Sequence, residues 1–470
     1  MKKQSALLIA LSLLLAVFGC TKSEEAKPEK PIKQNTQQTE FTPEDDYYFS
    51  DLSNERYDGY NYRILVRKNQ SGTQYFDEPK EDIVSNAIYE RNKAVEERYG
   101  ITISVSETSN AEYETDALNS ILAGDDAYDV IFPHSRAAFV YAVNGAGVNL
   151  HDVSTLHLDK PWWAQDIVDS CTVNGNLYVL DGDISSAGLS CTACLYFNKR
   201  IFDELGFDYP YDTVREGEWT FDEFSYLARK GGVDLNGDGI LNITDDQYGF
   251  STSKWGAPII MPYTGGQRIY DSDDAGNLYI SLYTNKTVDM YSDLFGLMRG
   301  EYSTYDGTDA TFTDGRLMFM YSLLGSAQGF RNMDDEFGIV PFPKYDIDDS
   351  YATITDGWAP LLVMPITVSD YERTGAITEA LCAYGSKLVI PSFYDKALKT
   401  KYARDDDSKE MMDIIKDSRV FDIGYLSGGA LQSTGYELAD SANADFASFY
   451  AKNENSAQST LGKFVKDYGA

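Results

Sequence analysis

Three short apolar runs, Tyr62-Arg-Ile-Leu-Val66, Ile101-Thr-Ile-Ser-Val105 and Asp129-Val-Ile-Phe132, decide the fold of this chain together with the segments between them. Residues 84–99 and 118–122, which separate the runs, place apolar side chains at helical spacing. Strands that alternate with helices in this way are typical of a parallel sheet covered by helices on both faces. The predicted fold class is therefore α/β.

The same alternation continues through the middle of the chain. Leu195–Lys199 is a predicted strand, and Trp219-Thr-Phe-Asp-Glu-Phe224 opens a predicted helix. Thr220 and Glu223 have the spacing of a capping box, in which each side chain satisfies a free amide at the helix start. From Glu379 onward the chain is predicted to be mainly helical, and no internal repeat is present.

The N-terminus has the features of an export signal. Lys2 and Lys3 precede the apolar run Ala6–Phe18, which is shorter than the roughly 20 residues that span a bilayer. Gly19-Cys20 resembles the bacterial lipobox, so residues 1–19 are the predicted signal peptide and Cys20 the predicted site of acylation, with palmitate among the acyl chains. Ordinary signal cleavage is the alternative, because Phe18 is bulkier than the lipobox prefers. Residues 20–60 are predicted to form a flexible tether, since the polar stretch that follows Cys20 cannot bury a core.

Charge excludes several classes of partner. The chain has 74 acidic and 40 basic residues and a formal net charge of −34. Such a surface repels phosphates and anionic lipid headgroups, so nucleic acid is excluded and membrane contact is expected through the lipid anchor only. Three histidines argue against a histidine-rich metal enzyme.

Cysteines are sparse after the anchor. Cys191 and Cys194 have the spacing of a redox motif, but they lie in a predicted strand and not at a strand-to-helix turn. Cys171, Cys191, Cys194 and Cys382 leave two alternatives open, a disulfide that involves Cys171 or four buried thiols.

One loop has the pattern of a calcium site. Oxygen-bearing residues occupy alternate positions, a glycine follows at position six, and an acid stands at position twelve, which suits the six to eight oxygen ligands of Ca²⁺. The predicted ligands are Asp234, Asn236, Asp238, the Ile240 carbonyl, Asn242 and Asp245. Asp246 leaves the register of the last ligand open, and an acidic surface turn is the alternative. Leu241 is expected to anchor the loop to the core.

Several motifs in order resemble the extracellular solute-binding proteins of ABC importers, in the carbohydrate-binding group that includes maltose-binding protein. They are Tyr128–Ile131, Asn174–Tyr178, Tyr196–Lys199, Trp219–Phe224, Tyr248–Phe250, Phe312–Arg316 and Gly338–Pro343. The resemblance implies a two-lobed, type II periplasmic-binding-protein-like fold with a hinge and an interlobe cleft. Lobe one would hold residues 61–182 and 359–404, and lobe two would hold residues 183–358 and 405–470.

Sugar sites combine aromatic walls with a few placed polar groups, and loops at strand ends build the clefts of α/β folds. The residues that fit this pattern are Ser135, Arg136, Asp183, Ser186, Trp255, Tyr321, Ser322 and Trp358. Trp162 and Trp163 are further candidates for the cleft, whereas Trp219 is expected in the core. Each polar candidate has an alternative as a solvent-exposed loop residue, and Arg136 could pair with a surface carboxylate.

The resemblance and the lipobox together imply a monomeric receptor on the extracellular face of the cell membrane, in a Gram-positive bacterium. It would capture a sugar by hinge closure and deliver it to the permease subunits of an ABC importer, without catalysis. A secreted carbohydrate-active enzyme, a dockerin-like interaction protein and a receptor for a peptide, polyol or phosphorylated solute are the alternatives. No nucleophile, base and orienting group occur together in a known motif, and the overall acidity disfavours anionic ligands.

Overall fold

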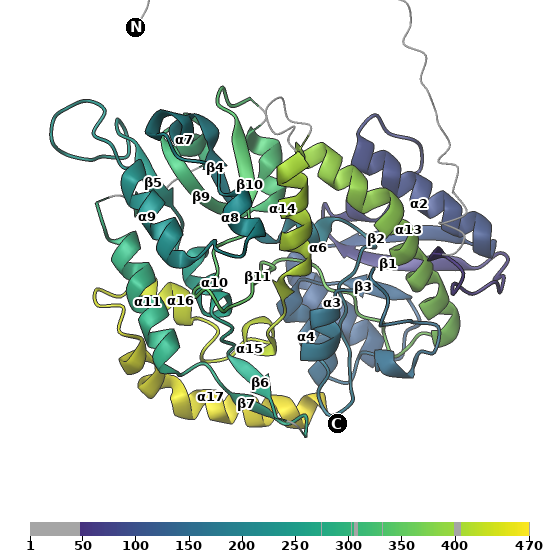
Figure 1. The fold of residues 1–470 in the computed structure, drawn as a ribbon. Coiled ribbons are helices and arrows are strands. Elements are labelled where there is room, and N and C mark those ends of the chain that lie inside the picture. Colours follow the sequence, from purple (N-terminus) through teal and green to yellow (C-terminus); the bar gives the residue numbers. More distant parts are fainter. Residues whose placement is uncertain are drawn as a thin grey trace, which may run out of the picture. The chain divides into compact units, whose positions relative to one another are not determined.

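The computed structural model describes residues 48–273, 275–301, 303–304, 309–330, 332–398 and 406–469 (Figure 1). The predicted signal peptide, Cys20 and the first part of the predicted tether lie outside these residues. The chain divides into a segment Met1–Ser50 and a compact unit Asp51–Ala470, to which all elements below belong. Within the described part, no helix has both the length and the apolar character needed to cross a bilayer.

The first sheet confirms the strands expected at the start of the domain. β1 (Asn61–Arg67) lies in the centre and pairs in parallel with β2 (Thr102–Thr108) and β3 (Val130–Phe132). The connections are α2 (Ile83–Tyr99) and α3 (Asn110–Leu122). Gly100 ends α2 as predicted, because its φ of 72° lies in the left-handed region that glycine adopts without strain.

The chain leaves this sheet and returns to it much later. Leu180 and Ile131 form antiparallel bridges with Leu362 and Val363, which places residues 362–363 beside the first sheet. The remaining elements of this first lobe are α4 (Ser135–Val143), η2 (Leu150–Asp152), α5 (Gln165–Ser170), η1 (Ser71–Thr73) and the long α13 (Tyr371–Leu398). α13 packs along α2, so two segments distant in sequence cover one side of the lobe (Figure 1).

The second sheet has five strands in the order β10-β4-β9-β5-β8. Their bounds are β4 (Ala193–Asn198), β5 (Tyr248–Ser251), β8 (Ser303–Thr304), β9 (Leu317–Leu323) and β10 (Phe337–Val340). β4 runs antiparallel to both of its neighbours, whereas β5 is parallel to β8 and β9. The second sheet is therefore mixed, whereas the first is parallel throughout. Its antiparallel pairs need no crossover helix between the paired strands.

Helices and short strands complete this second lobe and the links between the lobes. They are α6 (Ala187–Ser190), α7 (Lys199–Leu205), α8 (Tyr211–Arg215), α9 (Phe221–Gly231), α10 (Ala257–Thr264), β6 (Tyr270–Ser272), β7 (Leu278–Ile280), α11 (Asn285–Met298), α12 (Asp309–Thr313), η3 (Leu324–Phe330), β11 (Thr353–Ile354), α14 (Asp406–Asp417), β12 (Arg419–Val420), α15 (Ile423–Leu426), α16 (Thr434–Asp440) and α17 (Phe446–Tyr468). Thr220 caps α9 by accepting a hydrogen bond from the Glu223 amide at 3.4 Å, which is one of the two bonds expected of the capping box. Trp219 is fully buried and donates to the Pro341 carbonyl, which confirms its place in the core.

Two predicted boundaries are wrong. Residues 57–60 belong to the folded unit and not to the tether, because the Tyr57 and Gly59 amides donate to the Tyr99 and Gly100 carbonyls at 2.8 Å. The end of α17 lies against the first lobe, where the Tyr468 hydroxyl donates to the Cys171 carbonyl at 2.9 Å. Residues 405–470 are therefore not confined to the second lobe.

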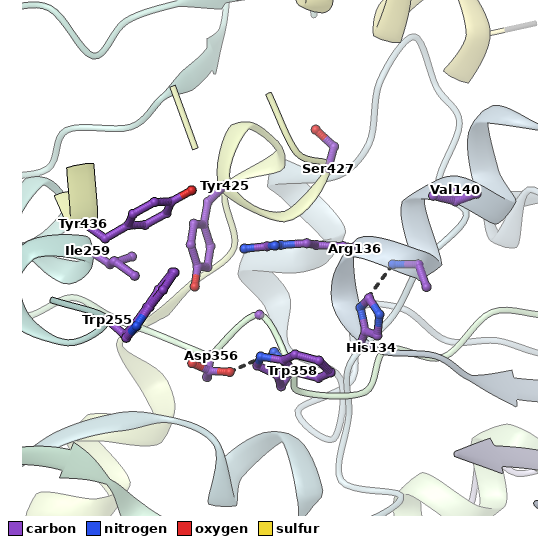
Figure 2. Close-up of a pocket in the computed structure, with 12 residues that line it drawn as sticks. His134, Arg136, Val140, Trp255, Ile259, Asp356, Trp358, Tyr425, Ser427 and Tyr436 are labelled. Atoms are coloured by element: carbon purple, nitrogen blue, oxygen red, sulfur yellow. Dashed lines mark hydrogen bonds between the residues drawn. The ribbon is translucent and has the colours of Figure 1, made fainter. Parts of the chain in front are cut away.

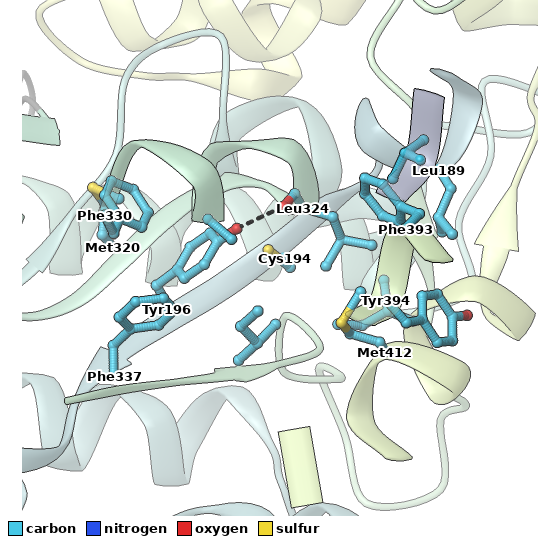
Figure 3. Packing of buried hydrophobic residues seen from close by; sticks show 14 of the residues in the cluster. Leu189, Cys194, Tyr196, Met320, Leu324, Phe330, Phe337, Phe393, Tyr394 and Met412 are labelled. Carbon is cyan, nitrogen blue, oxygen red and sulfur yellow. Dashed lines mark hydrogen bonds between the residues drawn. The ribbon is translucent and has the colours of Figure 1, made fainter. Parts of the chain in front are cut away.

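An aromatic core joins the second sheet to the helices around it (Figure 3). Tyr196 on β4 makes edge-to-face contacts with Phe312, Phe330 and Phe337, and its hydroxyl donates to the Leu324 carbonyl at 3.0 Å. The same cluster includes residues of α2, α13 and α14, so the core extends from the second sheet to helices of the first lobe. This packing supports the strands of the second sheet, and the loops at their ends start from it.

Candidate functional site

A pocket of about 750 Å³ lies where loops from the two lobes meet (Figure 2). Its lining comes from the start of α4, from the segment after β11, from the loop between β5 and α10, and from α15 and α16. The lining residues are His134, Arg136, Ala137, Val140, Trp255, Ile259, Asp356, Gly357, Trp358, Tyr425, Ser427 and Tyr436. His134, Trp255 and the segment 356–358 lie in loops that follow strands, which is where ligand sites form in open α/β sheets.

Two indole rings form the apolar part of this pocket. Trp358 is 62% exposed and Trp255 is 53% exposed, although both lie within a concave surface. The Trp358 ring lies 5.4 Å from the His134 ring, and Arg67 donates to the Trp358 carbonyl at 2.8 Å. These contacts hold Trp358 at the first lobe.

The second indole has its own support in the other lobe. The Trp255 ring lies 4.4 Å from the Tyr436 ring at an interplanar angle of 37°. Lys254 lies 5.6 Å from the centre of the Trp255 ring and pairs with Asp440 at 2.6 Å. Both indoles therefore keep apolar surface available while their backbones are fixed, which is the arrangement that stacking on a flat ligand requires.

Polar groups of the pocket lie between the two indoles. An Asp356 carboxylate oxygen accepts the Trp358 amide at 2.8 Å, and the Asp356 amide donates to the Cys191 carbonyl. The Arg136 side chain extends from α4 toward Tyr425 (Figure 2). Burial raises the pKa of Tyr425 to about 12, with the Asp356 carboxylate adding to the rise and Arg136 opposing it. The Tyr425 hydroxyl is thus protonated at neutral pH, and the pocket offers both donors and acceptors for hydroxyl groups.

The structure brings together Arg136, Trp255 and Trp358 among the predicted ligand residues. The other predicted residues are absent from the lining of this pocket, and several have internal partners. Ser135 is buried and donates to the Ala359 carbonyl at 3.0 Å, and Asp183 is buried and pairs with Lys416 at 2.8 Å.

The remaining predicted ligand residues follow the same pattern. Ser186 directly precedes α6, and the Ser322 hydroxyl bonds to the Ser326 hydroxyl at 2.8 Å. Tyr321 packs on Phe342 at 5.8 Å, and burial raises its pKa well above the ordinary value. The Ser322 and Tyr321 side chains therefore contact other residues of the second lobe and not the pocket.

Sequence reasoning missed Asp356, Tyr425 and Tyr436. Asp356 was detectable, because it stands two residues before Trp358 in a predicted strand-end loop. Tyr425 and Tyr436 lie on C-terminal helices that reach the pocket through long-range packing, such as that of α16 on α10. No local pattern signals such a contact.

Trp162 and Trp163 are structural residues of the first lobe. Both are 2% exposed, and their indole nitrogens donate to the two carboxylate oxygens of Glu379 at 3.1 and 2.9 Å. Burial raises the pKa of Glu379 to about 8. Neither tryptophan lines the large pocket.

The predicted calcium loop folds around its own backbone. Asp234 accepts hydrogen bonds from the Gly237 and Gly239 amides at 2.7 Å. The Asp246 carboxylate accepts the Leu235 and Asn242 amides, which closes the loop.

Other ligands of the predicted set are similarly engaged. Asn236, Asp238 and Asn242 each accept a hydrogen bond from a loop amide, and Asp245 and Ile240 are exposed. Leu241 packs against the core as expected. Over the part of the chain that the structure describes, no three histidine, cysteine or acidic side chains are grouped for a metal ion, so calcium stays a prediction.

The four cysteines of the domain are free thiols in the structure. Cys194 lies in β4, and Cys191 precedes the strand at the end of α6. Burial raises the pKa of Cys191 to about 11, so this thiol is not activated for redox chemistry at neutral pH. Of the two alternatives, the structure has the free thiols.

The chain is similar to known proteins in sequence and in fold. The family profile of bacterial extracellular solute-binding proteins matches residues 90–382, which is more than half of the chain. No functionally curated protein matches the chain in sequence.

Solved structures with the same fold include several receptors. A maltose/maltodextrin-binding domain from Bdellovibrio bacteriovorus, bound to maltotriose, has a TM-score of 0.53 at 14% identity and covers 86% of this chain and 100% of its own. A sugar transporter from Rhizobium etli in an open conformation has a TM-score of 0.57 at 14% identity, with coverage of 87% and 99%. An ABC transporter solute-binding protein from Agrobacterium radiobacter K84, in complex with ribitol, has a TM-score of 0.52 at 16% identity, with coverage of 86% and 100%. The profile match and the shared fold lead to one conclusion: the chain belongs to the family of bacterial extracellular solute-binding proteins.

Proposed function

We propose that this protein captures a sugar or oligosaccharide in the pocket between its lobes and delivers it to the permease subunits of an ABC importer. The observation that carries the proposal is the pair of exposed indoles, Trp255 and Trp358, which face one pocket from different lobes. Pyranose rings present flat C–H faces that stack on indoles and hydroxyls that pair with groups such as Asp356 and Tyr425. Solved structures of this fold hold maltotriose and ribitol, which supports a polyhydroxylated ligand.

Capture would work by closure of one lobe on the other. The chain passes between the lobes after Leu180, after β11 and after α13, and β11 pairs with β12 at this junction. Ion pairs join these passages, since Asp181 pairs with Arg419 and Asp183 pairs with Lys416. Few covalent links and a shared pocket are what hinge closure around a ligand needs. Closure would bring Trp255 toward Trp358 and remove water from the ligand.

The proposed location is the extracellular face of the cell membrane. The basic start, the apolar run and Gly19-Cys20 support export and acylation at Cys20, and the polar stretch after it supports a tether. A lipid-anchored receptor suits a Gram-positive cell, where no periplasm confines a free one. Analysis of acyl chains on the protein purified from membranes tests the anchor. As the control, a Cys20→Ala variant is expected to be released into the medium.

The proposed activity is binding without turnover. The family is one of binding proteins, and the pocket holds one carboxylate, Asp356, whereas glycoside hydrolysis uses a pair on either side of the bond. A carbohydrate-active enzyme would release reducing sugar from a ligand that binds. The absence of product after prolonged incubation with a bound oligosaccharide would favour the receptor.

Calcium is proposed as a structural ion of the loop 234–245. Support comes from the spacing of Asp234, Asn236 and Asp238 and from the contact of Leu241 with the core. The ion would replace amide hydrogens as the partner of the loop carboxylates and would stiffen the lobe surface. It has no part in the proposed ligand chemistry.

A thermal-shift screen of the purified protein tests the proposed function. The panel should contain monosaccharides, oligosaccharides, polyols and peptides, because a ligand that binds only the folded state raises the melting temperature. A rise with a saccharide is expected. A rise with peptides alone would contradict the saccharide proposal and leave the receptor fold with another ligand class.

A further inference from the structure

Arg136 differs from the other cationic side chains around the pocket. Arg67 donates to the Trp358 carbonyl, and Lys254 pairs with Asp440. Arg136 is exposed in the pocket, and its side chain makes no hydrogen bond or ion pair with any other residue that the structure describes. A chain with 74 acidic and 40 basic residues has carboxylates available almost everywhere. An arginine left unpaired at this point therefore offers its guanidinium to the ligand.

Arg136 is not explained by helix stability. It is the second residue of α4, where the helix dipole disfavours a cation and favours an anion. Its side chain extends toward Tyr425 and the centre of the pocket, and not along the helix surface (Figure 2). The position therefore costs a little local stability and places five N–H donors where a ligand would lie.

The Asp356 carboxylate, the second charged group of the pocket, has a different role. One Asp356 oxygen accepts the Trp358 amide, which orients the carboxylate, and among the ion pairs of the described residues none joins Asp356 to Arg136. Lobe closure would remove water from both groups, and an unpaired buried charge is costly. A ligand that satisfies the site must therefore accept hydrogen bonds in a fork at Arg136 and donate them at Asp356.

We propose that the ligand is an acidic saccharide that carries a uronate carboxylate, an inference that rests on the saccharide function proposed above. The carboxylate binds the Arg136 guanidinium, for which bidentate pairing is the strongest arrangement. Sugar hydroxyls donate to Asp356, and sugar rings stack on Trp255 and Trp358. One carboxylate matches one guanidinium, whereas a phosphate or sulfate ester places more anionic oxygens near Asp356.

The overall charge of −34 does not prevent this binding. At physiological ionic strength, charges beyond about 8 Å are screened, so the contacts inside the pocket decide the affinity. The repulsion acts on the approach of the anion and makes the association slower at low salt than at physiological salt.

Calorimetric titration of the full chain with paired ligands tests the proposal. The probes are an oligogalacturonate, an oligoalginate and a glucuronoxylan fragment, each compared with its own methyl ester, which keeps the rings and removes the charge. A sulfated galactan oligosaccharide serves as the other anion. At least one uronate should bind about 10- to 100-fold more tightly than its ester, the range expected for a charge-assisted pair.

Variants assign the effect to one side chain. Arg136→Met should weaken binding of the acid far more than binding of the ester, so that the preference for acid over ester falls to about one, and Arg136→Lys should restore part of the preference. Arg229→Met is the matched control, since Arg229 is exposed in the last turn of α9 and does not line the pocket, and it should keep the full preference.

The outcomes separate this inference from the proposed function. Esters or neutral saccharides that bind as tightly as the uronates would overturn the acidic ligand and leave the saccharide receptor standing. A preference for the sulfated probe over every uronate would overturn the carboxylate assignment. If a folded, monodisperse sample binds no saccharide, acidic or neutral, the proposed function fails together with the inference.

Discussion

Truncation of the two pocket tryptophans should weaken ligand binding by an amount that the exposed surface sets. Trp358 is 62% exposed and Trp255 is 53% exposed. A tryptophan can bury up to ~250 Å², so a ligand that covers half of the exposed part would bury ~75 Å² on Trp358 and ~65 Å² on Trp255. At ~25 cal/mol per Å², this burial amounts to ~1.9 kcal/mol for Trp358 and ~1.6 kcal/mol for Trp255.

These free energies correspond to measurable losses of affinity. Trp358→Ala should weaken binding about 20-fold and Trp255→Ala about 15-fold, since 1.4 kcal/mol is a factor of ten. Trp→Phe at either position should recover part of the loss, because a smaller ring still stacks. Tyr226→Ala is the control, since this tyrosine is 51% exposed on α9 and does not line the pocket.

Isothermal titration with the saccharide that gives the largest thermal shift measures the effect, and circular dichroism checks that each variant is folded. Native affinity in both alanine variants would refute the stacking argument. If Tyr226→Ala lost as much affinity as the tryptophan variants, general surface changes and not the pocket would be responsible.

The remaining predictions concern stability. Burial raises the pKa of Glu379 from 4.5 to about 8, so the folded protein keeps a proton that the unfolded chain releases above pH 4.5. The stability from this group is fully present below pH 4.5 and is lost as the pH rises to about 8. Glu379→Gln should therefore flatten the decline in unfolding free energy over that window. Equal pH slopes of the unfolding free energy for the variant and the native protein, measured by urea unfolding, would contradict this. Trp219→Ala should cost about 3–5 kcal/mol of unfolding free energy, because it empties a fully buried site, and a loss below about 1 kcal/mol would refute the core assignment. Calcium at 100 times its dissociation constant should stabilise the protein by about 2.7 kcal/mol, an effect that chelator or Asp234→Asn removes; identical melting with calcium and with chelator would refute the predicted ion.

The first sheet was predictable because its signals are local. Each of its strands is a short apolar run, and α2 has both its periodicity and its terminal Gly100 within one continuous segment. The second sheet was only partly predictable. β4 could be recognised as a strand, but its antiparallel pairing with β9 and β10 depends on residues more than 100 positions away in the sequence.

The pocket shows the same division between local and long-range information. Trp255 and Trp358 were predictable, because each lies in a glycine-containing loop at the end of a predicted strand, Trp255 after one strand and Trp358 before another. Ser135 was predicted with Arg136, yet successive helix residues differ by about 100° in direction, so Ser135 points into the protein and bonds to Ala359. Asp183 could not be assigned from sequence, because its partner Lys416 lies far along the chain.

A crystal structure of the protein with the saccharide of highest affinity is the most direct test of the central claim. The account predicts electron density for sugar rings between Trp255 and Trp358, with a polar substituent at Arg136 and hydroxyls at Asp356. Saccharide density at another surface, with this pocket filled by water alone at saturating ligand, would contradict it.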